Sequence, residues 1–196
     1  MTNYNITISR EFGSGGAEIG KRVAKKLNIP YYDKNVNEFT AVKTGFSKQT
    51  IESSQDKTPS AFTYGMLSYV KLPPLHDEIF FAQAEVIKSL AAKGPCVIVG
   101  RCADYVLNDK NNVINVFIYA PLEQRIKRIS KLHSIPYEQA RKMIKYNDRK
   151  RKRYHEHYSH GAWGNARNYH ITLSSCVGLE RAAQAIVSLA TNYSTK

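Results

Sequence analysis

The pattern that most limits the fold lies in the first thirty residues, where a short β-branched segment precedes a glycine-rich turn and an amphipathic helix. Asn5–Ser9 alternates apolar and polar residues, as a short strand does. The turn is Gly13-Ser14-Gly15-Gly16, and Ile19, Val23, Ala24 and Leu27 then recur at helical spacing. Strand, glycine turn and helix in this order open a parallel α/β unit.

The same alternation of strands and helices continues along the chain. Further strand patterns lie at 29–33, 96–100, 113–119 and 171–173, and helical patterns at 76–92, 122–132, 136–154 and 179–190. Cys96–Gly100 is a continuous apolar run of the type that a central strand needs when both its faces are covered. We therefore predict an α/β fold of three layers, a parallel sheet between helices, in a single domain over 1–196.

Several polar or glycine residues come directly after these predicted strands. They are Gly13–Gly16, Asp33, Arg101 and the pair Ser174/Ser175. Because parallel strands end at one edge of a sheet, where ligands of such folds bind, we expect these residues to gather in one site. For Ser174/Ser175 the alternative is an ordinary helix N-cap, and for Asp33 it is an N-cap of the segment that starts at Lys34.

The glycine turn has the construction of a phosphate loop but departs from the usual pattern GxxxxGK[ST]. Gly15–Lys21 matches the first seven positions, but Arg22 stands in place of Ser or Thr, and Lys21 belongs to the helix. In the register that starts after the strand, Gly16 takes the place of the lysine. Phosphate binding and a purely structural turn are both compatible with the glycines alone. Arg10 is the nearest residue that can replace part of the missing charge.

A set of ordered motifs resembles the cytidylate kinase-like family. They are Thr7–Gly16 with Ile19-Gly20, Tyr32-Asp33-Lys34, Val97–Asp104, Asp148 followed by Arg151, and Trp163-Gly164 before Asn168-Tyr169. The resemblance runs over nearly the whole chain. It implies a P-loop nucleoside monophosphate kinase with a five-stranded parallel sheet, a helical monophosphate-binding insertion at about 34–75 and an arginine-rich lid at about 133–167. The core would then comprise 1–33, 76–132 and 168–196.

The resemblance also implies ATP-dependent phosphoryl transfer with Mg²⁺, to a nucleoside monophosphate such as CMP or dCMP. Its expected catalytic residues are Arg101, Asp148, Arg149, Arg151 and Arg153, and its nucleotide-binding residues are Arg10, Gly13, Ser14, Gly15, Gly16, Asp33, Asp104, Ser174 and Ser175. Arg101 would hold the acceptor phosphate, with an ion pair to Asp33 or Asp104 as the structural alternative. Asp148 would orient Arg151, and no side chain is assigned directly to the metal. In cytidylate kinases an aspartate follows the arginine that matches Arg101, whereas here Cys102 occupies that place.

The charge of the chain leaves two other functions open. The net charge is +13, and +7 of it lies between Arg141 and Arg153. Such a segment indicates a polyanionic partner or a solvated helix face. The missing loop lysine favours a nucleotide-binding protein without kinase activity, and the basic helix favours, less strongly, a nucleic-acid-binding protein.

The remaining composition indicates a cytoplasmic protein with no membrane partner. No apolar run is long enough to span a bilayer, and Cys96, Cys102 and Cys176 form no CxxC pair, so reduced thiols are expected. His155, His157 and His160 lack the spacing of a tetrahedral metal site, and we interpret them as part of a lid surface. Tyr158, Trp163 and Tyr169 are interpreted as packing residues rather than as a base-stacking platform.

Overall fold

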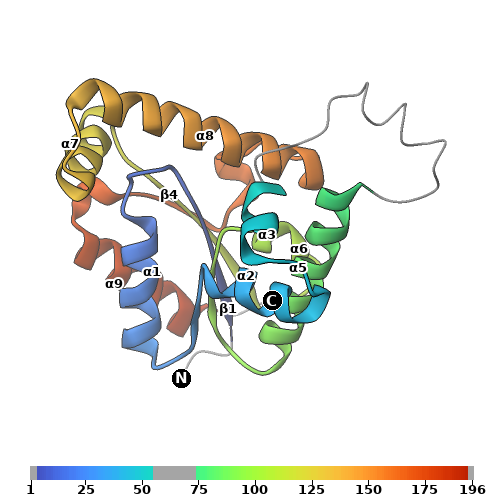
Figure 1. The fold of residues 1–196 in the computed structure, drawn as a ribbon. Helices are drawn as coiled ribbons and strands as arrows, with labels where there is room; N and C mark the ends of the chain where they lie inside the picture. Colours follow the sequence, from blue (N-terminus) through green and yellow to red (C-terminus); the bar gives the residue numbers. More distant parts are fainter. Residues whose placement is uncertain (1–3, 55–73, 194–196) are drawn as a thin grey trace.

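The computed structural model describes residues 4–54 and 74–193 (Figure 1). Its strands are β1 Asn5–Arg10, β2 Tyr31–Tyr32, β3 Val97–Val99, β4 Val113–Tyr119 and β5 Ile171–Ser174. Its longer helices are α1 Gly16–Leu27, α2 Asn35–Thr44, α3 Lys48–Ser54, α5 Leu75–Ala92, α7 Leu122–His133, α8 Tyr137–Ser159 and α9 Leu179–Asn192. The short α6 spans Ala103–Val106, and 3-10 turns cover Ala166–Asn168 (η1) and Ser175–Val177 (η2).

The sheet has five parallel strands in the order β2-β3-β1-β4-β5. The central strand β1 pairs with β3 and β4, and Ile6 lies opposite both Val97 and Ile114. Placing the first strand in the centre brings the glycine turn that follows it to the middle of the sheet's edge. The predicted fold class is confirmed.

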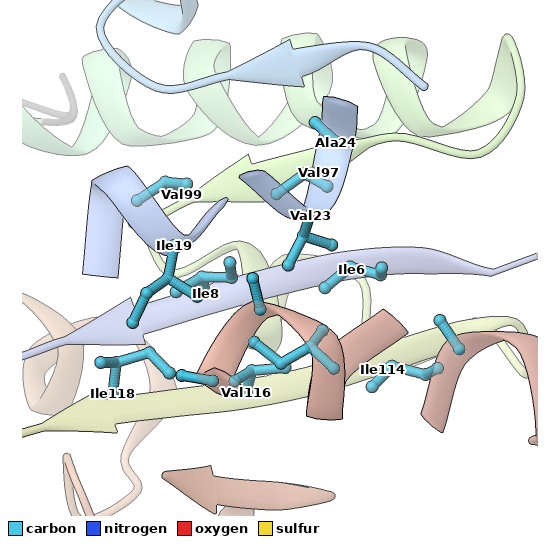
Figure 2. Packing of buried hydrophobic residues seen from close by; sticks show 14 residues of the cluster. Ile6, Ile8, Ile19, Val23, Ala24, Val97, Val99, Ile114, Val116 and Ile118 are labelled. Carbon is cyan, nitrogen blue, oxygen red and sulfur yellow. The ribbon is translucent and has the colours of Figure 1, made fainter. Parts of the chain in front are cut away.

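The two faces of the sheet have separate cores. Helices α1 and α9 cover one face, where Ile6, Ile8, Val116 and Ile118 pack against residues such as Ile19 and Ile186 (Figure 2). A Cβ at Gly20 would lie only 3.1 Å from Ile8 Cδ1, so this glycine lets α1 approach the sheet closely. On the other face α2, α5 and α6 pack on β3.

Helices α7 and α8 form a third cluster at the end of the molecule where the strands finish (Figure 1). Ile126 and Ile129 of α7 are buried against Ala140 and Ile144 of α8, and Phe12 of the glycine turn packs against them. This cluster holds the basic helix next to the glycine turn.

Most element boundaries agree with the sequence-based expectations, and the exceptions lie at helix ends. Helix α8 continues to Ser159 rather than ending near Tyr154, so His155 and His157 are helical. Three residues separate the short helix α6 from the end of β3, and this helix was not expected from the sequence. The weak helical patterns at 36–42 and 48–53 correspond to α2 and α3, whereas 55–73 of the expected insertion lie outside the described residues. Among the helices within 4–54 and 74–193, none has the length and apolar character needed to cross a bilayer.

The three cysteines are free and differ in burial, which gives a direct test of the fold. Cys96 and Cys102 are buried and Cys176 is exposed. Burial raises the pKa of Cys96 to about 12 and raises the pKa of Cys102 as well. We expect a thiol-specific reagent at pH 8 to modify Cys176 alone in the native protein and all three thiols in denaturant, as measured by mass spectrometry. Rapid native labelling of Cys102 would contradict the position of α6 under α8.

Candidate functional site

The glycine turn connects β1 to α1 and lies against α7. Gly13 and Gly15 have φ values of 79° and 85°, which favour glycine, and α1 begins at Gly16. A Cβ at position 13 would lie 2.9 Å from Ile129 Cγ1, and one at position 15 would lie 2.7 Å from Arg128 Nη1. The turn therefore has the build of a phosphate loop. Its conformation requires glycine at positions 13 and 15, and close packing against α7 adds to this requirement at position 13.

Side chains of α7 and α8 fix the backbone of this turn. Asp148 Oδ1 accepts a hydrogen bond from Phe12 N at 2.7 Å, and its Oδ2 accepts from Arg125. The buried Arg125 also donates to Ala120 O and to Phe12 O, and Arg128 donates to Gly13 O at 2.9 Å. Asp148 thus holds the turn and Arg125 by its hydrogen bonds, and its charge also acts on Arg151, the residue that it was expected to orient.

Arg10 ends β1, and its side chain crosses the glycine turn. A Cβ at Gly16 would lie 2.6 Å from the Cβ of Arg10, and a Cβ at Gly100 would collide with Arg10 Nη1. Arg10 Nη2 is 3.6 Å from Asp33 Oδ1. Arg10 therefore fills the space that a side chain at position 16 would take, and its guanidinium lies between the turn and the ends of β2 and β3.

Arg101 follows β3 in a stretch of left-handed backbone. Gly100, Arg101 and Cys102 have φ values of 78°, 59° and 52°, and for residues other than glycine such values are uncommon and cluster at functional sites. Burial lowers the pKa of Arg101, and the nearby Asp33 is among the groups that oppose this shift. Arg101 therefore lies near the acidic side chain that Arg10 also approaches.

Arg151 reaches this place from α8. Its Nη1 donates to Arg10 O at 2.9 Å, and its guanidinium carbon lies 5.2 Å from the centre of the Phe12 ring. Burial is the main cause that lowers the pKa of Arg151, and the neighbouring Arg10 lowers it further. The structure thus brings a residue of the expected lid into contact with the end of β1.

Arg10, Arg101 and Arg151 form what we call the arginine cluster, with Asp33 as their common acidic neighbour. Burial lowers the pKa of Arg10 as well, Asp33 raises it and Arg101 lowers it again. Arginine stays cationic near neutral pH, so three positive charges share Asp33 in a partly desolvated place, and Asp148 offsets part of the charge at Arg151. Like charges that have lost water are costly to hold together, and a bound anion removes that cost. The geometry is suited to a phosphate group.

Asp33 is part of the cluster and does not cap a helix with its carboxylate. Its Oδ2 accepts from Tyr31 at 3.3 Å, and the N-cap of α2 is Lys34 without a side-chain cap. The N-cap interpretation of Asp33 is therefore wrong.

Arg149 and Arg153 do not join the cluster. Both are exposed, whereas Arg151 between them is partly buried. On an α-helix residues two positions apart point about 200° apart, so these arginines cannot share a ligand with Arg151 from one helix. Their exposed side chains extend the basic surface of α8 together with Arg141, Lys142, Lys145 and Lys152.

Asp104 also lies apart from the arginine cluster. Its Oδ2 is 2.8 Å from Nε2 of His155, and both side chains are buried. Ser159 Oγ is 3.0 Å from the other ring nitrogen of His155. This pair joins α6 to α8, so the interpretation of His155 as a lid-surface residue is wrong.

Ser174 and Ser175 lie at the end of β5 and have structural environments. Ser174 Oγ accepts a hydrogen bond from Cys176 N at 3.3 Å and caps η2. Ser174 is therefore an N-cap, as the structural alternative predicted. Ser175 is buried. Neither serine is placed next to the arginine cluster by a described hydrogen bond.

The aromatic residues in and next to the expected lid pack as predicted. Trp163 and Tyr169 contact Phe117 with ring centres 5.3 and 5.1 Å apart, and Tyr158 stacks on Phe80 at 3.7 Å. A cavity of about 420 Å³ is lined by Glu11, Tyr119, Trp163 and Thr172.

Arg125 and Arg128 are site residues that sequence reasoning missed. They are spaced as i and i+3 on α7 and therefore share a helix face, which is the one signal for them in the sequence. Apart from Ala120 O, their hydrogen-bond partners Phe12 O, Gly13 O and Asp148 lie more than twenty positions away, so the sequence alone does not identify what they hold.

Together, the sheet order and the glycine turn define a P-loop kinase fold, with the arginine cluster at the carboxyl edge of its sheet. The model of the cytidylate kinase-like family matches residues 5–176, and the chain belongs to that family.

Solved structures agree with this fold. An uncharacterized protein from Eubacterium ventriosum ATCC 27560 is 28% identical, with a TM-score of 0.74 over 97% of this chain and 99% of that one. The shikimate kinase from Acinetobacter baumannii in complex with shikimate is 19% identical, with a TM-score of 0.53 over 98% and 96% of the two chains. A gluconokinase from Sinorhizobium meliloti 1021 is 13% identical, with a TM-score of 0.53 over 97% and 95%. The comparison with curated proteins gave no match. Family and fold together support a kinase.

Proposed function

We propose that the protein transfers the γ-phosphoryl group of ATP to a nucleoside monophosphate, with CMP or dCMP as the first acceptors to test. The observation that carries the proposal is the contact of Arg151 with Arg10 beside the glycine turn. It joins a residue of the basic helix to the turn in one anion site. Phosphoryl transfer depends mostly on positioning and charge neutralisation, and such a site supplies both.

On the donor side, the main-chain amides of residues 13–16 bind the outer phosphates of ATP. Arg10 supplies the positive charge that the absent loop lysine would provide. Support for Arg10 comes from its side chain, which fills the space above Gly16. A guanidinium offers two parallel donors to phosphate oxygens, so it neutralises charge there as a lysine does and with a more fixed direction.

On the acceptor side, Arg101 holds the phosphate of the monophosphate and Asp33 fixes the arginines around it. Arg151 lies between the two phosphates and stabilises the charge of the transferring group. Its carbonyl contact and its position over Phe12 hold the guanidinium before the substrates arrive, which is the preorganisation that electrostatic catalysis requires.

The residues near the turn fit a magnesium ion that the nucleotide itself carries. The usual loop hydroxyl has no counterpart, because Ser14 is fully buried and its Oγ is shielded from solvent. Mg²⁺ commonly keeps water ligands and binds through substrate phosphates and one or two carboxylates, and Asp33 is the carboxylate nearest to the cluster. When bound, the ion would neutralise charge on the donor phosphates.

A coupled assay of ADP formation across the common NMPs and dNMPs tests the proposal. We expect ATP- and Mg²⁺-dependent turnover with one acceptor class, and direct detection of the diphosphate product by chromatography. Shikimate and gluconate belong in the same panel, because kinases of these acceptors share the fold. Saturable nucleotide binding without any diphosphate product contradicts the enzyme and supports the second candidate.

That second candidate is a nucleotide-binding protein without kinase activity. The specific observation in its favour is the replacement of the loop lysine by Gly16, whose place is closed to a side chain by Arg10. For either function we propose a cytoplasmic location, where ATP is available and the three thiols stay reduced.

A further inference from the structure

Outside the arginine cluster, two histidines and an aspartate converge where α5 begins and α8 ends. His76 and Asp77 lie in the first turn of α5, and His157 lies in the last turn of α8. The candidate ligand atoms of these three residues all lie within 4.8 Å of one another. His76 and His157 are 81 positions apart in the sequence, so only the packing of α5 against α8 brings the three residues together.

The distances within this group are close to those of a metal site. His76 Nε2 is 3.4 Å from Asp77 Oδ1, and His157 Nε2 is 3.9 Å from the same oxygen. Zinc with ligands at about 2.0–2.2 Å in a tetrahedral arrangement keeps its ligand atoms roughly 3.3–3.5 Å apart. Small side-chain rotations therefore bring all three atoms to one ion, and a water would complete four-coordination.

The surroundings suit such an ion. Asp77 Oδ1 accepts a hydrogen bond from Tyr158 Oη at 3.1 Å, and the ligating groups of metal sites are commonly oriented by hydrogen bonds of this kind. The side chains of His76 and Asp77 are only 14% and 13% exposed. Tyr158 itself stacks on Phe80 of α5, so the two helices are already packed where the ion would bind.

We propose that His76, Asp77 and His157 form a site for a divalent transition metal, with Zn²⁺ as the first ion to test. Two imidazole nitrogens and one carboxylate favour zinc, iron or cobalt over Mg²⁺ and Ca²⁺, which prefer oxygen ligands. The site is separate from the kinase proposal and needs no nucleotide.

A metal here would fasten α8 to α5. Arg151 precedes His157 by six residues, which is about 9 Å along the helix axis. The ion would thus fix the end of the helix that carries a member of the arginine cluster. Its effect is structural, and its loss should increase the mobility of the C-terminal part of α8.

The test uses the full chain without a histidine tag, freed of metal with EDTA and titrated with ZnCl₂ in an isothermal calorimeter in excess MgCl₂. We expect one Zn²⁺ per chain and a rise in melting temperature on adding ZnCl₂. His157→Ala removes a ligand and should weaken binding by more than the roughly 10–100-fold that losing an outer-shell partner costs. His133→Ala is the control, because His133 is an exposed histidine of α7 outside this group.

Asp77→Asn keeps the size of the side chain and supplies a second variant if His157→Ala fails to fold. It should also lose most of the affinity, while circular dichroism shows an unchanged fold. CoCl₂ should give visible absorption bands in the wild-type protein that are absent in both variants. The absence of Zn²⁺ binding by the folded wild type, or binding that His157→Ala and Asp77→Asn leave unchanged, overturns the proposal.

Discussion

We expect Arg151→Ala to lower kcat/KM for phosphoryl transfer by at least about 10³-fold, the lower end of the effect of an arginine that stabilises the transferring phosphoryl group. The reason is the position of its guanidinium, which contacts Arg10 O beside the glycine turn and shares Asp33 with the other arginines. The measurement is the coupled assay with the best acceptor of the panel. Circular dichroism and the melting temperature show whether the variant is folded.

Arg149→Ala is the matched control, because it removes an exposed arginine from the same helix two positions away. We expect its kcat/KM to stay within a few-fold of the wild-type value. Equal losses in the two variants would mean that α8 acts through its overall charge, and the assignment of Arg151 to the arginine cluster would then be wrong.

The second large effect concerns stability. Asp148→Ala should lower the free energy of unfolding by about 3 kcal/mol, the low end of the range for removing one partner of a buried ion pair. The variant leaves Phe12 N without its acceptor and leaves the buried Arg125 with Glu11, whose Oε2 is 3.3 Å away, as its acidic partner. Urea denaturation followed by circular dichroism measures the change.

The control for this stability effect is again Arg149→Ala, which should change the free energy of unfolding by no more than about 0.5 kcal/mol. The double variant Asp148→Ala with Arg125→Met should recover part of the loss, because the buried charge that has lost one of its two acidic partners is then removed as well. A loss below about 1 kcal/mol in Asp148→Ala would show that the carboxylate contributes little to holding the turn.

The fold was predictable from the sequence because its signals are local. Continuous apolar strands and helical spacing depend on nearby residues, and the parallel order follows from their alternation. The same argument placed Gly13–Gly16, Asp33 and Arg101 at one edge of the sheet, and Arg10, Arg101 and Asp33 lie together there.

The direction of individual side chains was not predictable in this way. Whether Arg149 or Arg151 faces the turn depends on the rotation of α8, which the packing of Ile144 and Ala140 against α7 fixes. Likewise, the partner of Asp148 is a main-chain amide far away in the sequence. His155 was misjudged because α8 extends beyond the point where its apolar pattern fades, and contacts with α5 and α6 stabilise the extra turn.

The crossing of Arg10 over Gly16 has a consequence for finding related proteins. In this chain the arginine beside the glycine turn, Arg10, precedes the turn and is the last residue of β1. Its side chain can pass over the start of α1 only because residue 16 is a glycine. A search for the lysine after the glycines would overlook any protein built in this way. Looking for an arginine at the strand end paired with a glycine six positions later would recover it.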